Sequence, residues 1–229
     1  GFGFSREQAS AIVGLYGFSV YLASLPGGWI ADRLLGLQRA IFIGACLITA
    51  GHLCIGLSGL AGPGAGKLPF FLGLVLIVMG TGLLKPNISA IVGDLYPEGG
   101  SRRDAGFSIF YMGINTGAFA GQLITGALGE KVGWHWGFGA AGVGMLLGLI
   151  VFSMTRHKTL RGIGMDITRH PDPAIQARQE RTVKLATFGG IGIIALIFLL
   201  AATGTVTIDA AAIGRHLVNI TLALVTLFF

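Results

Sequence analysis

The chain has 229 residues, of which 53% are hydrophobic and only 11% are charged, and its formal net charge is +6. A soluble domain carries about 25% charged residues, so this composition excludes an ordinary soluble protein. The positive charge does not indicate a nucleic-acid-binding protein, because the basic residues mark the ends of apolar blocks and do not gather on one soluble domain.

Seven apolar blocks predict seven membrane-spanning helices. Each block is close to the ~20 residues that a helix needs to cross the hydrocarbon core, apart from the last, which is shorter. We therefore expect an all-α, polytopic membrane protein. The predicted spans are residues 9–31, 39–57, 68–92, 105–128, 136–154, 185–203 and 213–229.

The positions of lysine and arginine predict the orientation of these spans. Most of the sixteen basic residues lie in alternate loops, those after the first, third and fifth spans. Such an excess marks the cytoplasmic side. The first span then begins outside, and the sequence has no initiator methionine. We therefore expect a preceding span and interpret the chain as an internal portion of a larger transmembrane protein.

The first span carries a tyrosine at mid-depth and a charged end. Tyr21 lies eleven residues before Asp32, and it is a candidate for ligand contact, although a buried tyrosine often only packs against a neighbouring helix. Asp32 and Arg33 stand in the sequence "GGWIADRLLG", at a helix end where charges interact with the terminus. They are either a simple cytoplasmic anchor or a latch that breaks and forms as a transporter changes state.

The third span contains the sequence "TGLLKPNISA", which places a lysine inside the apolar region. Lys85 lies nine residues from Asp94, roughly 13 Å into the membrane. Burying its charge there costs at least ~2.5 kcal/mol on insertion scales. Because every acid in the chain lies in a loop or at a span end, its partner must come from another helix or from a substrate carboxylate. The alternative is a lysine with only a folding role.

The fourth span, in "GFSIFYMGINTGAFAGQLITG", also contains polar residues within an apolar segment. Tyr111 and Asn115 stand at i and i+4 and so share a helix face. Three glycines at spacing four, between Gly113 and Gly121, predict the close approach of a neighbouring helix. One side of this helix would pack while the other presents polar groups. For Asn115 the alternative is a hydrogen bond between helices.

A polar segment separates the fifth and sixth spans. Residues 158–184 contain Pro171 and Pro173 and predict a cytoplasmic linker, solvated and close to anionic lipid. One short helix is expected after its "HPDP" sequence. The predicted organisation is thus a transmembrane bundle in residues 1–157, a linker in 158–184, and a truncated pair of spans in 185–229.

These motifs resemble a known family. "GGWIADRLLG" resembles the loop signature after the second helix of the major facilitator superfamily. "GTGLLKPNISAIVGDLY", followed by "RRDAGFSIFYMGINTGAF", resembles the proton-coupled oligopeptide transporters of that superfamily. The resemblance covers about residues 1–158 and implies helices two to six of the N-terminal bundle. The last two spans resemble the extra helix pair of bacterial members, which implies the bacterial inner membrane.

The resemblance also implies roles for single residues. Lys85 matches a lysine implicated in proton coupling and peptide carboxylate contact, and Asn115 matches a peptide-binding asparagine. Tyr21 matches a tyrosine of the binding cavity, and Tyr111 lies in the fifth-helix motif. The family's first-helix E-x-x-E-R motif and the acidic residues of its second half are absent from these 229 residues. This portion alone is therefore not expected to transport.

The predicted function is proton-coupled symport of di- and tripeptides by alternating access around a site near the midplane. The expected partners are peptides, protons and membrane lipid, with no cofactor beyond the proton gradient, no metal and no nucleic acid. One alternative is the same fold carrying another small anion such as nitrate, and another is a membrane scaffold without transport. An enzyme is not expected, because no nucleophile–base or metal constellation is present.

Overall fold

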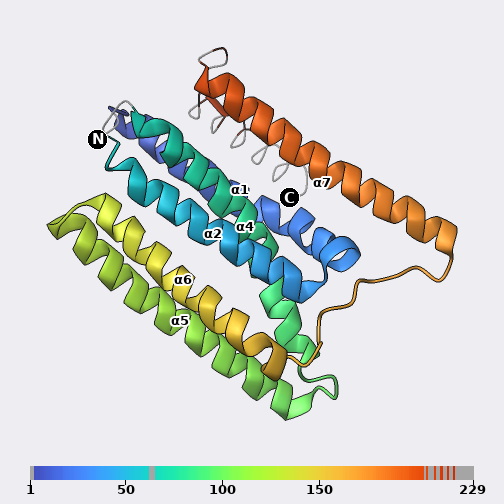
Figure 1. The fold of residues 1–229 in the computed structure, drawn as a ribbon. Helices are drawn as coiled ribbons and strands as arrows, with labels where there is room; N and C mark the ends of the chain where they lie inside the picture. The colour runs from blue at the N-terminus through green and yellow to red at the C-terminus, as the bar shows by residue number, and fades with distance from the viewer. Residues whose placement is uncertain are drawn as a thin grey trace.

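The computed structural model describes residues 3–61 and 65–203, and the single positions 205, 209, 212, 213, 216 and 219. Within these residues the long helices run side by side, and successive helices of the bundle alternate in direction (Figure 1). The predicted span 213–229 lies, apart from isolated positions, outside the described residues. The elements are α1 (Arg6–Ile30), η1 (Ala31–Leu35), α2 (Leu37–Ser58), α4 (Lys67–Asp94), α5 (Gly100–Lys131), α6 (Trp134–Thr159) and α7 (Pro173–Ala202).

The all-α membrane fold is confirmed. Five segments of the described chain are long and apolar enough to span a membrane, namely α1 with η1, α2, α4, α6 and α7. Helices suit this environment because they satisfy every backbone polar group internally where water is absent. The helix over the predicted fourth span, α5, is long but less apolar, because it begins with "GSRRD" and carries polar residues along its length.

Helix α7 differs from the sequence prediction. We expected a short helix after "HPDP" and a separate span from residue 185, but one helix runs without a break from Pro173 to Ala202. Proline is suited to a first helical turn, and the Asp172 side chain caps the helix by accepting a hydrogen bond from the Ala174 amide at 2.8 Å. The polar stretch that follows contains no helix breaker, so the helix continues into the apolar residues.

The most extensive packing joins α2 to α4, and glycines determine it. A Cβ added to Gly44 would lie 2.6 Å from the carbonyl oxygen of Gly80, and one added to Gly51 would lie 2.7 Å from that of Gly73. Each helix therefore presents two glycines at spacing seven to the other. Such small residues let two helix backbones approach closely in a membrane.

The beginning of the linker packs on the bundle. Gly36 has a φ of 78°, a left-handed conformation that suits glycine, and it abuts the Met165 carbonyl. The buried Gln38 side chain donates a hydrogen bond to the Ile163 carbonyl at 2.7 Å. Leu160 joins a small buried core with two isoleucines from α2 and α4. The linker is thus not solvated throughout, because its first residues close this end of the bundle.

Candidate substrate and coupling site

Two of the predicted site residues meet across the α1–α4 interface. The Lys85 Nζ lies 4.3 Å from the centroid of the Tyr21 ring. An ammonium at this distance from an aromatic face is attracted by the ring quadrupole. The side chains are nevertheless accessible: Lys85 is exposed and Tyr21 is 70% exposed. The arrangement holds a positive charge over a phenol ring and leaves both side chains open to a ligand.

The lysine has no carboxylate partner in the described part of the chain. The two ion pairs found there, Arg102 with Glu98 and Lys184 with Glu180, join neighbours on single helical turns. Lys85 belongs to neither, and the Tyr21 ring cannot neutralise its charge. An ammonium in this state attracts an anion, whether from a protein carboxylate or from a ligand.

Close backbone packing fixes the position of the Lys85–Tyr21 pair. A Cβ added to Gly27 of α1 would overlap the carbonyl group of Gly82 on α4. Beside this crossing, Asn87 is buried with 2% of its surface exposed. Its Nδ2 donates to the Leu83 carbonyl at 2.6 Å and approaches the Gly27 carbonyl at 3.4 Å.

Asn87 is therefore a packing residue in this structure. It stands two residues after Lys85 in the sequence "KPN", and its amide faces the neighbouring helix. A buried polar group needs hydrogen-bond partners, and here the two carbonyls supply them. The signal that could have revealed this role is Gly27 on α1, but its carbonyl is identified as a partner only once the two helices are paired.

Helix α5 holds the other two predicted site residues. Tyr111 is 52% exposed and stacks on Phe107 with ring centroids 6.2 Å apart. The exposed Asn115 donates from Nδ2 to the Tyr111 carbonyl at 2.9 Å. These contacts stay within α5, which packs against α6 and not against α1 (Figure 1). The structure thus brings Tyr21 and Lys85 together, and it leaves Tyr111 and Asn115 on a separate surface.

The predicted latch residues lie in η1, a π-helical turn that follows α1. The Arg33 Nη1 donates to the Gln179 Oε1 at 2.8 Å, which connects η1 to α7 across 146 positions of sequence. The Asp32 carbonyl accepts a hydrogen bond from the Thr168 amide at 2.7 Å. The Arg33 link runs to α7, and the Asp32 link runs to the segment between α6 and α7. Sequence reasoning missed Thr168 and Gln179, since nothing local marks either as a partner.

The profile of the POT family matches residues 38–169, which is more than half of the chain. The chain belongs to the POT family. The matched region contains α2, α4, α5, α6 and the beginning of the linker. The predicted resemblance to proton-coupled oligopeptide transporters is confirmed at the level of the family.

Relatives in this family have peptide transport in their names. The chain is 43% identical over 229 residues to the peptide transporter YePEPT of Yersinia enterocolitica, and covers 44% of it. It is 44% identical over 197 residues to a di-/tripeptide transporter of Lactococcus lactis, which corresponds to 86% of this chain and 37% of that protein. The chain therefore spans less than half the length of these relatives.

A solved structure of the POT family has the same fold. The crystal structure of a peptide transporter in complex with sulfate superposes with a TM-score of 0.80 at 43% sequence identity, over 99% of this chain and 44% of the other. The membrane location follows from this membership and from the long apolar helices. The POT protein described here is an integral, multi-pass membrane protein.

Proposed function

We propose that this POT protein acts as a proton-coupled symporter of di- and tripeptides, working by alternating access. The names of its relatives support the substrate class. The observation that carries the proposal is the exposed Lys85 ammonium, held against Tyr21 and without a carboxylate partner in the described residues. A peptide supplies the complementary group, because its C-terminus is a carboxylate.

Proton coupling follows from competition for this ammonium. A protein carboxylate paired with Lys85 would occupy it, because opposite charges within a few ångströms stabilise each other. When that carboxylate takes up a proton, the pair dissolves and Lys85 is free to bind a peptide carboxylate. Binding of the proton and of the peptide are then linked through one cation. Lys85 is thus both a substrate-binding and a proton-coupling residue in this proposal.

The remaining site residues have supporting roles. Tyr21 positions Lys85 and offers its hydroxyl to the peptide, while Tyr111 and Asn115 present polar groups from the exposed surface of α5. Asp32 and Arg33 act as the latch, because their links to Thr168 and to Gln179 of α7 would be made in one state and broken in another.

Uptake of a labelled dipeptide by full-length protein in proteoliposomes tests this function. Lys85→Ala should abolish uptake driven by a proton gradient, while Lys67→Ala should retain it. Lys67 is a matched control, because its Nζ also lies over an aromatic ring, that of Phe4, at 5.4 Å, but at the far end of α4. Driven uptake that survives in Lys85→Ala at the unsubstituted rate would remove Lys85 from coupling.

The same cation would also suit another small anion, so competitors separate the two substrate classes. Excess di- and tripeptides should suppress uptake of the labelled dipeptide, whereas nitrate at the same concentration should not. Thiol labelling of Lys85→Cys from the aqueous phase addresses a scaffold without transport. Labelling is expected in at least one state, and its complete absence in all states would favour the scaffold.

A further inference from the structure

A cavity of about 320 Å³ lies between the end of α1 and the first half of α7. It is separate from the site of Lys85 and Tyr21, because its walls come from α1, η1 and α7 and include no residue of α4. Its walls combine apolar surface with two guanidinium groups. The residues that line it are Trp29, Arg33, Ile175, Arg178, Gln179, Thr182 and Val183.

The polar groups of this cavity favour an anion. Arg33 and Arg178 supply guanidinium donors, and Thr182 supplies a hydroxyl. Gln179 turns its Oε1 to Arg33, so that its amide nitrogen remains as a further donor. Neither arginine forms an ion pair in the described residues, where the two ion pairs involve other side chains. The cavity therefore holds positive charge that a bound group can neutralise.

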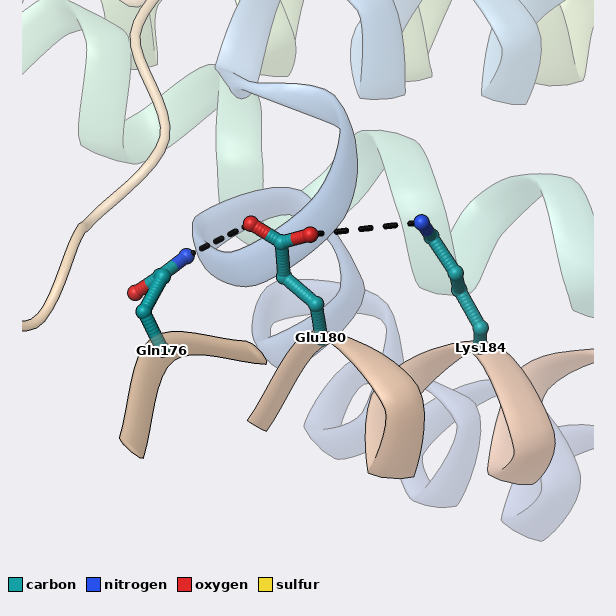
Figure 2. Close-up of polar contacts among 3 residues, drawn as sticks. All are labelled: Gln176, Glu180 and Lys184. Atoms are coloured by element: carbon teal, nitrogen blue, oxygen red, sulfur yellow. Dashed lines mark hydrogen bonds and ion pairs between the residues drawn. The ribbon is translucent and has the colours of Figure 1, made fainter. Parts of the chain in front are cut away.

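The acids near these arginines contribute no carboxylate to the cavity wall. Asp32 and Glu180 are the acids closest in sequence to these arginines, and neither lines the cavity. Glu180 lies on the adjacent stripe of α7, where its Oε1 accepts from Gln176 Nε2 at 2.8 Å and its Oε2 lies 3.9 Å from Lys184 Nζ (Figure 2). One stripe of α7 is thus internally paired, while the adjacent stripe faces the cavity with Arg178, which forms no ion pair in the described residues.

The level of the cavity in the membrane indicates which kind of anion it would bind. In α7 the cavity residues end just before the apolar stretch that begins at Leu185, and in α1 they begin at Trp29, where the apolar stretch ends. Both helices therefore pass from lipid to water at this height, and tryptophan favours that interface. The distribution of lysine and arginine predicts this to be the cytoplasmic side, whose leaflet contains anionic lipids.

We propose that the cavity between α1 and α7 binds the phosphate headgroup of an anionic phospholipid. The two guanidinium groups engage phosphate oxygens, as arginine does with planar or tetrahedral oxyanions. The apolar wall formed by Trp29, Ile175 and Val183 receives the glycerol and upper acyl region. The lipid then bridges α7 to the bundle, next to the single Arg33–Gln179 hydrogen bond. This site lies apart from Lys85 and Tyr21, but it includes Arg33, to which the proposed function assigns the latch.

Native mass spectrometry of the full-length, delipidated protein tests the site, with phosphatidylglycerol as the probe. Arg178→Gln should weaken phosphatidylglycerol binding about fivefold, the effect of one basic residue at a lipid headgroup. Arg181→Gln is the matched control, because Arg181 is exposed on the same helix but does not line the cavity. Thr182→Trp fills the cavity without a change of charge and should weaken binding at least as much.

Three results would overturn the proposal. Equal weakening by Arg178→Gln and Arg181→Gln would indicate a general basic surface. Equal affinity for phosphatidylglycerol and phosphatidylcholine would exclude recognition of an anionic lipid. Displacement of the lipid by inorganic phosphate at millimolar concentration would indicate a free-anion site. Retained folding of each variant is checked by its thermal unfolding temperature, so that a lost signal refers to binding.

Discussion

Two regions of this protein carry regularly spaced glycines, and the structure uses them differently. On α2 and α4, Gly44 and Gly80 bring the two backbones into contact. On α5, a Cβ added at Gly113, Gly117 or Gly121 would meet no other atom of the described residues within 4 Å. The sequence pattern is equally clear in both regions. The spacing of glycines therefore shows that a neighbouring helix can approach closely. Whether one does depends on which helices the fold places side by side.

The same contrast separates two asparagines, Asn87 and Asn115. Asn87 belongs to the closely packed region, where it is buried and faces α1. Asn115 belongs to the open region, where its amide bonds to its own helix. The packed region formed by α1, α2 and α4 is thus a frame that holds Lys85 in place. The open surface of α5 is the part that remains available for a ligand or another helix.

The largest expected effect on stability comes from replacing one glycine by alanine in the packed region and one in the open region of α5. Gly80→Ala should destabilise the protein by about 3 kcal/mol, because its Cβ would lie 2.6 Å from the Gly44 carbonyl and neither backbone can move freely. Gly117→Ala should stabilise it by about 0.5 to 1 kcal/mol through helix propensity. Thermal unfolding of the purified proteins in detergent measures both. Similar losses in the two variants would show that α5 is also closely packed and would end the contrast.

A smaller effect is expected from the two asparagines. Asn87→Ala should cost about 1.5 kcal/mol, because it removes a buried hydrogen-bond donor at the α1–α4 crossing. Asn115→Ala should change the stability by less than about 0.5 kcal/mol, as is usual for an exposed position. The readout is again the unfolding temperature, with peptide affinity as the second measurement. For peptide affinity we expect the reverse order, with the larger loss in Asn115→Ala. A larger loss of affinity in Asn87→Ala would contradict the division between the packed frame and the ligand-binding surface.

The smallest effect is expected on the paired stripe of α7. Lys184→Ala should change the free energy of unfolding by less than about 0.5 kcal/mol, because its contact with Glu180 is an exposed ion pair within one helix. Lys184→Arg, which keeps the charge, is the control. Hydrogen exchange of the α7 backbone provides a local measurement. A marked loss of protection in α7 would show that this stripe, like the packed frame, holds the helix in place.

The sequence determined the class of protein and the most unusual residue. Long apolar blocks can be satisfied in lipid only as helices, so the helical membrane fold followed from composition, and the cost of a charge at mid-depth marked Lys85. The family motifs then predicted the POT fold. These inferences succeed because they depend on the medium and on local sequence, and not on which helix lies next to which.

Tertiary structure alone decided the partners. It paired Lys85 with Tyr21 across 64 positions, buried Asn87 at a helix crossing, and joined Arg33 to Gln179. It also selected which glycines are contacts and which remain open. None of these contacts can be predicted from the spacing of residues in the sequence, because each helix has several faces that carry small or polar residues. The shape of the neighbouring backbone determines which face is used.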